Sequence, residues 1–444
     1  MSKSKGSISK GVDVITIWLY VLLVAIGLTA IFAVTYKEGD PVVSSFFTFK
    51  TDYSKQFIFF IVSFIIGVFI LVTDSKFFPA TANLWYAAGI LLLLLVFPFH
   101  SQVKGTESII RMGPIQFQPA EFCKVCVCLA LAKYISLPDM DFSKKRSQLI
   151  AAAIAITPAL ITIMQKETGL ALVYFSFFLV MYREGLPPTI LIIAFSIAAL
   201  VIASIVIEPN TLAIALTIIA ALVIFLNRRQ IRKRKSLVVP IIALWFVCVG
   251  IQRFAVPFLF SSVLQKHQVE RIYSLFGKDN PYSEGPVVVT ASGAKKDNTA
   301  DYNVRQSKIA IGSGGLLGKG LLQGTQTRYD FVPEQRTDFI FCTIGEGFGF
   351  IGTTVLLVVY LLLLFRIVTL AERQRSVFSR CYAYGVAAVF FFHIAINVAM
   401  TVGLAPVIGI PLPFVSYGGT ALLTFTILLF ILIRLDADRQ MVLR

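Results

Sequence analysis

The segment Phe331–Phe341, FVPEQRTDFIF, brings three ionisable residues next to a long apolar run. Glu334, Arg336 and Asp338 stand at alternate positions, and the apolar run begins directly after Asp338. A carboxylate at a membrane surface beside basic residues has the chemistry of a general base for a hydroxyl nucleophile. A simpler interpretation is about as strong on local sequence, because Thr337 and Asp338 also have the chemistry of a helix N-cap.

A glycine-rich stretch lies just upstream, QSKIAIGSGGLLGKGLLQGT from Gln306 to Thr325. Bare glycine N–H groups can approach a phosphate closely, and Lys308 and Lys319 would neutralise its charge. The strand, helix and spacing of a nucleotide-binding loop are absent. The pattern therefore fits an anion-binding loop and a plain surface turn about equally well.

Ionisable residues also occur inside apolar runs, where they are costly and by default indicate function. Glu121 and Lys124 stand three apart on one predicted helix and can neutralise each other, whereas Glu346 needs a partner from elsewhere in the fold. His393 and Asn397 are one helical turn apart. We expect these two to form a polar seam between helices rather than to line a cavity.

Two further patterns concern the backbone and the cysteines. The segment Pro406–Thr420, PVIGIPLPFVSYGGT, is rich in proline and glycine and cannot be a regular helix at lipid depth, so we expect a re-entrant or interfacial element lining a protein cavity. Cys123, Cys126 and Cys128 superficially resemble a metal motif. They lie in an apolar helix with no fourth ligand nearby, so we expect packing residues and no metal site.

The elements that must position these residues are long apolar helices. The 444 residues are 57% hydrophobic and only 14% charged, with a mean hydropathy of +0.80, which excludes an ordinary soluble enzyme. A window of about 20 residues, the length that crosses a bilayer, predicts twelve spans in a single all-α polytopic membrane domain, 1–444. The spans are 14–34, 56–73, 82–99, 118–135, 147–164, 168–182, 189–207, 211–226, 237–258, 339–365, 381–402 and 414–433.

The distribution of charged residues indicates how the chain is oriented in the membrane. Forty Lys and Arg face 24 Asp and Glu, a net charge of +16, and the basic residues gather in alternate loops, most densely in NRRQIRKRKS at 227–236. The positive-inside rule then places both termini in the cytoplasm, so the charge does not require a nucleic-acid partner. An anionic-lipid patch at 227–236 is the weaker alternative.

This orientation makes the segment 257–338 a long extracytoplasmic loop, and we expect the chemistry there. The loop carries ten basic and eight acidic residues on the side where positive charge has no topological role. An anionic, membrane-bound substrate would suit such a surface.

Four blocks together resemble the SEDS family (shape, elongation, division and sporulation), whose members are multi-span peptidoglycan glycosyltransferases. They are QPAEFCK at Gln118–Lys124, QSKIAIGSGGLLGKGLLQGTQ at Gln306–Gln326, PEQRTDFIF at Pro333–Phe341 and GIPLPFVSYGG at Gly409–Gly419. The wording of the second block is more similar to the elongation branch of the family than to the division branch. The blocks occur in the family's order over most of the chain.

The resemblance implies a polymerase of lipid II, the undecaprenyl-pyrophosphate-linked disaccharide pentapeptide, on the outer face of the bacterial cytoplasmic membrane, acting in cell elongation. It implies a class B penicillin-binding protein and other elongation-complex membrane proteins as partners, and it leaves open a divalent cation as cofactor. The same resemblance makes Asp338 the general base of an inverting transfer. The expected substrate-binding residues are Lys308, Lys319, Arg336, Glu121, Lys124, Gln306 and Ser416.

The chain also departs from the family pattern. The arginine and tryptophan that usually precede the QPAEFCK block are replaced around Glu107–Ile109, and the usual Q-P-D-x-G-T is QKETGL at Gln165–Leu170. The family's usual ten spans leave 208–258 as a probable extra hairpin, and Asn280–Ala300 looks like an insertion. An added hairpin keeps every later span in its orientation.

Three alternatives stay open at this point. A flippase or secondary transporter for lipid-linked precursors would also have many spans and buried charges, but we find no internal repeat and the polar residues are concentrated in one loop. A division-specific polymerase of the same family is the second. A scaffold that only recruits a cell-wall partner would leave Asp338 as a helix cap.

Overall fold

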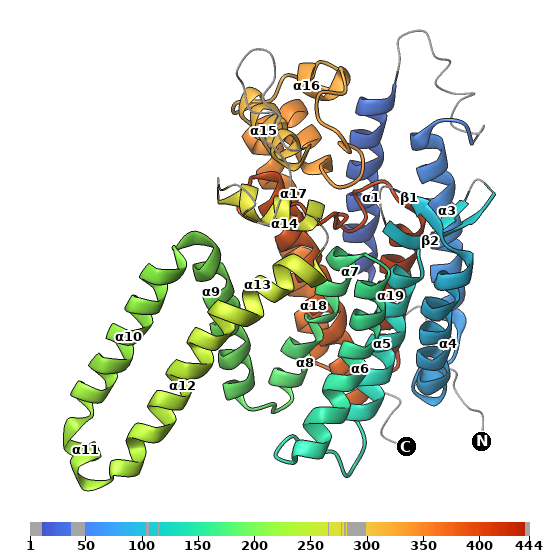
Figure 1. The fold of residues 1–444 in the computed structure, drawn as a ribbon. Coiled ribbons are helices and arrows are strands. Elements are labelled where there is room, and N and C mark those ends of the chain that lie inside the picture. The colour runs from blue at the N-terminus through green and yellow to red at the C-terminus, as the bar shows by residue number, and fades with distance from the viewer. Residues whose placement is uncertain are drawn as a thin grey trace, which may run out of the picture. The chain divides into compact units, whose positions relative to one another are not determined.

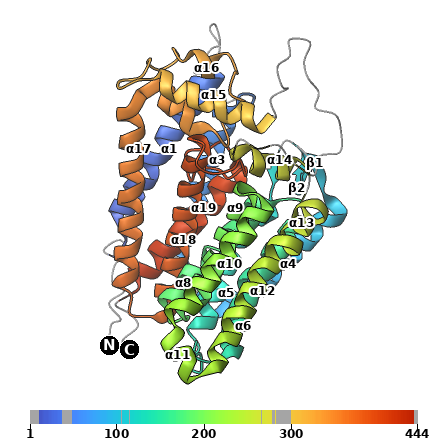
Figure 2. The ribbon, with the colours of Figure 1, turned by 60° about the vertical axis from the view of Figure 1, so that its left-hand side comes forward.

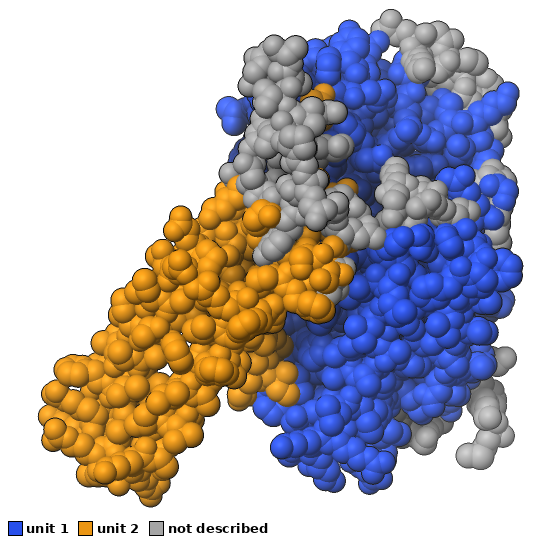
Figure 3. Space-filling view, viewed as in Figure 1, with its two compact units in different colours: residues 1–187, 303–444 blue, residues 188–302 orange. Residues whose placement is uncertain are grey.

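The long apolar runs fold as helices, and within the described residues ten helices are long and apolar enough to cross a membrane. The computed structural model describes residues 11–36, 49–103, 106–113, 115–264, 266–276, 278, 281 and 299–439. The chain divides into two units, 1–187 with 303–444 and 188–302, which Figure 3 colours separately. Each unit is described by itself.

The first unit begins with helices that follow one another in sequence (Figure 1). They are α1 (Val14–Thr35), α3 (Asp52–Val72), α4 (Phe77–Phe99), α5 (Pro119–Ile135), α6 (Lys145–Met164), α7 (Thr168–Tyr174) and α8 (Phe177–Arg183).

Every predicted span overlaps helical structure, but two are shorter than expected. The range 118–135 is α5, a helix of 17 residues, and the range 168–182 is divided between the short helices α7 and α8. The expected all-α polytopic fold is therefore confirmed, with ten full-length candidate spans in the described residues in place of twelve.

A small antiparallel sheet lies between α4 and α5. Its strands are β1 (Ser101–Val103), β2 (Thr106–Met112) and β3 (Ile115–Phe117), in the order β1-β2-β3. The second hairpin has a regular register, with Ile110 opposite Phe117 and Arg111 opposite Gln116. The sheet holds one of the two loops that depart from the family pattern.

The rest of the first unit supplies its centre. It comprises α15 (Thr299–Ser313), α16 (Thr325–Arg328), α17 (Ile340–Glu372), α18 (Val377–Thr401) and α19 (Gly419–Ala437). The apolar windows of α18 and α19 are 61% and 78% buried, against 39% or less for the other candidate spans, and 14 of the 17 residues of α5 are buried, so these three helices form the core. Figure 2 shows α17 running along the unit, with α15 and α16 at one of its ends.

The predicted loop 257–338 is largely helical where it is described, since it contains α14, α15 and α16. The proposed insertion Asn280–Ala300 lies outside the described residues, apart from positions 281, 299 and 300. The non-helical character expected for Pro406–Thr420 is confirmed up to Gly418, where α19 follows.

The second unit contains the predicted hairpin 208–258. It is built from α9 (Pro188–Val206), α10 (Pro209–Leu226), α11 (Arg228–Lys233), the 3₁₀ turn η2 (Lys235–Leu237), α12 (Val238–Gly250), the π-helical turns η3 (Ile251–Ala255) and η4 (Leu259–Val263), α13 (Val256–Phe258) and α14 (Lys266–Leu275). Helices α10 and α12 pack together, and the indole of Trp245 donates to the hydroxyl of Thr217 at 3.1 Å. That this hairpin is an addition to the family core stays a prediction.

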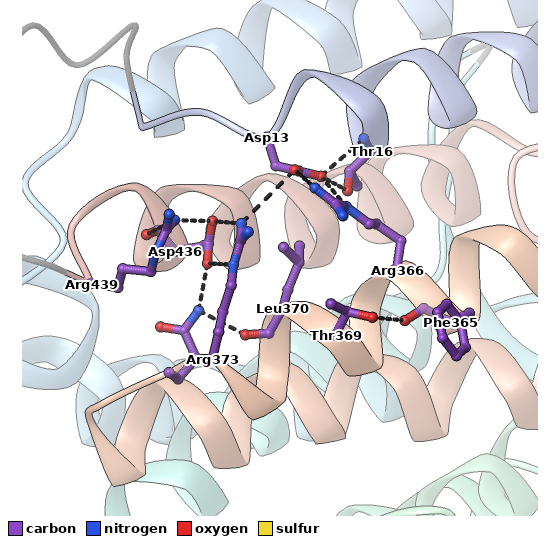
Figure 4. Close-up of polar contacts among 10 residues, drawn as sticks. Asp13, Thr16, Phe365, Arg366, Thr369, Leu370, Arg373, Asp436 and Arg439 are labelled. Carbon is purple, nitrogen blue, oxygen red and sulfur yellow. Dashed lines mark hydrogen bonds and ion pairs between the residues drawn. The ribbon is translucent and has the colours of Figure 1, made fainter.

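At one end of the first unit, an ion network joins three helices (Figure 4). Arg366 of α17 pairs with Asp13, which caps α1, and Arg373, the C-cap of α17, pairs with Asp436 of α19. Arg439 also donates to Asp436, at 2.9 Å. Because Asp338 precedes the other end of α17, the network and the candidate base lie at opposite ends of this helix.

Candidate active site

Asp338 lies two residues before the first residue of α17, and it is not the N-cap of the helix. The N-cap is Phe339, and it provides no side-chain hydrogen bond. The hydroxyl of Thr337 donates instead to the carboxylate of Glu334 at 2.9 Å. The interpretation of Thr337 and Asp338 as an N-cap is therefore wrong, because the helix starts one residue later than the local sequence suggests. The Asp338 side chain itself is half-buried.

The backbone before α17 is held by hydrogen bonds at three consecutive carbonyl groups. The carbonyl of Arg336 accepts from the N–H of Tyr417 at 2.8 Å, and the carbonyl of Thr337 accepts from the hydroxyl of Ser416 at 2.6 Å. The carbonyl of Asp338 accepts from the Nδ2 of Asn397 at 2.8 Å. The Pro406–Thr420 segment and α18 thus fix the backbone that carries the candidate base.

Ser416 was predicted to bind substrate, and the structure gives its hydroxyl two protein contacts. Besides donating to Thr337, its Oγ accepts from the N–H of Leu412 at 2.8 Å. The side chain is 4% exposed. Contact with a substrate stays a prediction, and the observed geometry gives Ser416 the role of joining two loops.

Arg336 projects from the same block and is half exposed. Its guanidinium pairs with the carboxylate of Asp52 in the first turn of α3. One turn further along α3, Gln56 donates to the carbonyl of Ser416 at 3.2 Å and accepts from the N–H of Gly418 at 3.1 Å. Sequence reasoning missed Asp52 and Gln56, although two polar residues spaced by four at the start of an apolar span were a usable signal.

The glycine-rich stretch folds back onto the first part of α17. The buried carboxylate of Glu346 accepts from Lys319 Nζ at 2.7 Å and from the backbone N–H groups of Gln326 and Thr327, each at 2.9 Å. The N–H of Lys319 donates to the carbonyl of Glu346 at 3.0 Å. Lys319 is therefore the partner of Glu346 that the sequence did not identify. The backbone N–H groups of Lys319, Gln326 and Thr327 all donate to Glu346.

A glycine is required where this loop meets the helix. Gly318 has φ +83°, and a Cβ there would collide with the backbone of Gly347 and Phe348. Gly318 therefore serves the close approach of loop and helix, whereas an added Cβ at Gly312 or Gly315 would meet no atom within 4 Å. An anion-binding role of this stretch stays a prediction. Substrate binding by Lys319 itself stays a prediction.

Gln306 and Lys308 lie on α15, on the same side of the molecule as the α17 N-terminus. Gln306 is half-buried, whereas Lys308 is exposed and its side chain runs against Gly403, just beyond α18. Between them, Ser307 is buried and donates to the carbonyl of Thr401 at 2.9 Å. Lys308 and Arg336 are thus the exposed cations among the predicted substrate-binding residues.

Glu121 and Lys124 form the predicted ion pair, at 2.6 Å, and both side chains are buried. Lys124 Nζ also donates to His393 Nε2 at 2.9 Å and lies 5.1 Å from the ring centre of Phe425. This pair therefore belongs to the interior, between α5, α18 and α19. A role in orienting substrate stays a prediction.

The two loops that depart from the family pattern contact each other. Lys166 Nζ pairs with Glu107 at 2.5 Å, and the hydroxyl of Ser108 donates to Glu167 at 2.9 Å. The hydrogen bond from Lys166 lowers the pKa of the Glu107 carboxyl. The residues that depart from the family pattern in one loop therefore bind residues that depart from it in the other.

Cys123, Cys126 and Cys128 are free thiols buried in α5. Among the residues that the structure describes, no three His, Cys, Asp or Glu side chains gather as a metal site. The thiol of Cys128 donates to the carbonyl of Tyr382 on α18 at 3.5 Å. These side chains therefore pack between helices.

Comparison with known proteins gives a consistent result. The family model described as "Cell cycle protein", of FtsW, RodA and SpoVE, matches residues 14–209 and 184–441. The peptidoglycan glycosyltransferase MrdB of Escherichia coli (strain K12) is 29% identical over 381 residues, 84% of each chain. The peptidoglycan glycosyltransferase RodA of Treponema pallidum (strain Nichols) is 28% identical over 437 residues, covering 94% of this chain and 96% of its own.

The fold is also similar to that of a solved structure. A chain of a peptidoglycan synthase complex, described for the coordination of polymerisation and crosslinking, superposes with a TM-score of 0.65 at 21% identity. The match covers 97% of this chain and 98% of that one. At this identity the likeness concerns the fold.

Proposed function

Because the chain belongs to the cell cycle protein family of FtsW, RodA and SpoVE, we propose that it polymerises lipid II into glycan strands at the membrane surface. It is a multi-pass membrane protein and a peptidoglycan glycosyltransferase, the activity named for its curated relatives. The same proposal includes a role in cell elongation, a reaction on the outer face of the cytoplasmic membrane, and termini in the cytoplasm.

Asp338 is the general base of this reaction. It takes the proton from the 4-hydroxyl of the acceptor sugar as that oxygen attacks the anomeric carbon of the growing chain. The bond from that carbon to undecaprenyl pyrophosphate breaks, and the configuration inverts. The observation that carries this assignment is the fixed backbone of residues 336–338, because a base held in place can be aligned with its substrate before reaction.

The exposed cations receive the leaving group. Arg336 lies two residues before Asp338 and exposes half of its side chain, and Lys308 is exposed on α15. Charge-assisted hydrogen bonds to a pyrophosphate stabilise the negative charge that grows on it during bond cleavage. A divalent cation at the pyrophosphate is compatible with this arrangement.

The partner is a class B penicillin-binding protein that crosslinks the new strand. This proposal is supported by the likeness in fold to a chain of a peptidoglycan synthase complex. Other elongation-complex membrane proteins are further partners.

Two other functions make different predictions. A flippase or transporter for lipid-linked precursors would move lipid II without forming polymer. A division-type polymerase of the same family would form the same polymer but would restore septation rather than rod shape in cells. We favour the elongation polymerase, since the curated relatives reported above carry the names MrdB and RodA.

The test is polymerisation of labelled lipid II by purified protein with its transpeptidase partner. Asp338→Asn keeps the size of the side chain and removes the base, so we expect the rate to fall about 10²- to 10⁴-fold. Asp330→Asn is the matched control, because Asp330 is an exposed acid that stands eight residues before Asp338. Full activity of Asp338→Asn contradicts the base assignment, and transport without polymer supports the flippase.

A further inference from the structure

Helix α18 carries two fully buried polar side chains on one face. His393 and Asn397 are four residues apart and each is 0% exposed. Burying an imidazole and an amide costs free energy unless hydrogen bonds compensate for lost water. Apolar residues would pack this helix at lower cost, so the contacts of these two side chains are informative.

Asn397 bridges two backbone segments that are far apart in sequence. Its Nδ2 donates to the carbonyl of Asp338 at 2.8 Å and to the carbonyl of Ile410 at 2.7 Å. Both acceptors require N–H donors, which fixes the orientation of the amide. One side chain therefore sets the spacing between the candidate base and the Pro406–Thr420 segment.

That spacing determines what the Asp338 carboxylate faces. Gly409 has φ +72°, and a Cβ there would lie 3.4 Å from Asp338 Oδ2. The carboxylate therefore lies against the backbone of Gly409, next to the residue that Asn397 holds. A shift of Ile410 relative to Asp338 would change the position of this carboxylate in the site.

His393 binds the same segment one residue beyond Ile410. Its Nδ1 donates to the carbonyl of Pro411 at 3.0 Å, so Nε2 is the unprotonated nitrogen and accepts from Lys124 Nζ at 2.9 Å. Lys124 pairs in turn with Glu121. The buried ion pair of α5 is thus linked to Pro411 through one imidazole.

From these contacts we infer that Asn397 and His393 are positioning residues for the base. Asn397 fixes Asp338 directly, and His393 fixes the Gly409–Pro411 backbone against which the carboxylate lies. The inference rests on the proposed function of Asp338. The two buried side chains of α18 then act in turnover, and not in substrate binding or in folding alone.

Three variants separate turnover from stability. Asn397→Asp keeps the shape but cannot donate to two carbonyls, and Asn397→Leu donates to none. Tyr382→Phe is the matched control, because it removes one buried hydrogen bond from the same helix, the 3.2 Å contact to the carbonyl of Leu428. We expect both Asn397 variants to lower kcat about 10- to 100-fold with KM within about twofold, and Tyr382→Phe to leave kcat unchanged.

His393 offers a conservative rescue. Glutamine can donate to the carbonyl of Pro411 and accept from Lys124, whereas phenylalanine can do neither. We expect His393→Phe to lose kcat and His393→Gln to keep most of it. Equal losses in the two variants would show that the ring is needed only for packing, which overturns the role of its hydrogen bonds.

Hydrogen exchange of the peptide 333–341 gives a second readout that needs no activity. Loss of one buried hydrogen bond should speed exchange there about five- to tenfold in Asn397→Asp, and not in Tyr382→Phe. Unchanged exchange together with unchanged kcat overturns the inference. Absence of polymer from wild type would instead contradict the proposed function, and exchange would still decide whether Asn397 positions Asp338.

Discussion

Arg336 shows how one side chain can serve the fold and the substrate. Its guanidinium pairs with Asp52, yet half of the side chain remains exposed. An exposed ion pair of this kind contributes little to stability, so it can be exchanged for a stronger anion at low cost. A pyrophosphate, with several oxygens for a planar guanidinium, is such an anion.

Arg336→Gln should therefore raise KM for lipid II about tenfold and change kcat less than threefold, because a charge-assisted hydrogen bond to substrate is lost. Asp52→Asn is the matched control: it removes the same ion pair and leaves the guanidinium, so KM should stay within about threefold of wild type. Steady-state polymerisation rates against lipid II concentration measure both. Equal increases in KM in the two variants would mean that Arg336 acts through the fold alone.

At the scale of elements, Glu346 joins the glycine-rich loop to α17. The loop has no regular structure of its own between Ser313 and Thr325, and the buried carboxylate holds it through a lysine and two backbone N–H groups. Removing the buried carboxylate takes away the acceptor of the Gln326 and Thr327 N–H groups, whereas Lys319 keeps its 2.9 Å contact to the Thr325 hydroxyl. The loop should then separate from the helix.

We expect Glu346→Ala to lower Tm by about 4–8 °C and to expose the loop to protease, since breaking a buried ion pair costs about 3–5 kcal/mol. Glu346→Gln keeps an acceptor for the N–H groups and should have roughly half that effect. Thermal unfolding in detergent and mapping of cleavage sites in 313–327 are the measurements. A loop that resists cleavage equally in wild type and Glu346→Ala contradicts this role.

The elements also show which contacts a sequence can predict. Apolar length predicted the helices, and spacing by three predicted the Glu121–Lys124 pair, because both signals are local. The partner of Arg336 is 284 residues away. The spacing of Asp52 and Gln56 is a local signal for two polar residues at the start of a span, but it does not show that Asp52 pairs with Arg336. The start of α17 was misplaced by one residue because Thr337 bonds backwards to Glu334 rather than forwards to the helix.

Some backbone conformations could not be predicted from the sequence either. Lys166 adopts φ +63° just after α6, a conformation that glycine or asparagine adopts more easily, and Gly349 breaks α17 with φ +66°. Neither conformation follows from residue type alone. The family resemblance named Asp338, but only the folded chain shows that Asn397, Ser416 and Tyr417 hold it.

For the whole first unit, α17 connects two polar clusters with different tasks. One end is preceded by the Asp338 block, and the other carries Arg366 and Arg373, which join α1 to α19 (Figure 4). Arg366 follows the first residue of α17 by 26 residues, so the two clusters lie roughly 40 Å apart along the helix, or less because of the break at Gly349. The second cluster is too far away to act on substrate, so its role is to close the bundle around its core helices.

This role predicts a dependence of stability on pH. Burial raises the pKa of the Asp13 carboxyl, but hydrogen bonds from Arg366 and Thr16 and the charge of Arg366 outweigh it, and the pKa lies below its ordinary value of 3.8. A carboxyl with a lowered pKa in the folded state stabilises the protein above its ordinary pKa, and this stabilisation is lost as the pH falls through the folded value.

Tm measured in detergent should therefore fall as the pH is lowered from about 5 to about 3, and part of that fall belongs to Asp13. Asp13→Asn cannot titrate, so it should lower Tm at neutral pH, and its Tm should depend less on acid than that of wild type. The matched control is Asp330→Asn, which removes an exposed acid outside the network and should keep the wild-type slope. Parallel pH profiles of Asp13→Asn and wild type would show that the network at this end of α17 contributes no titratable stability.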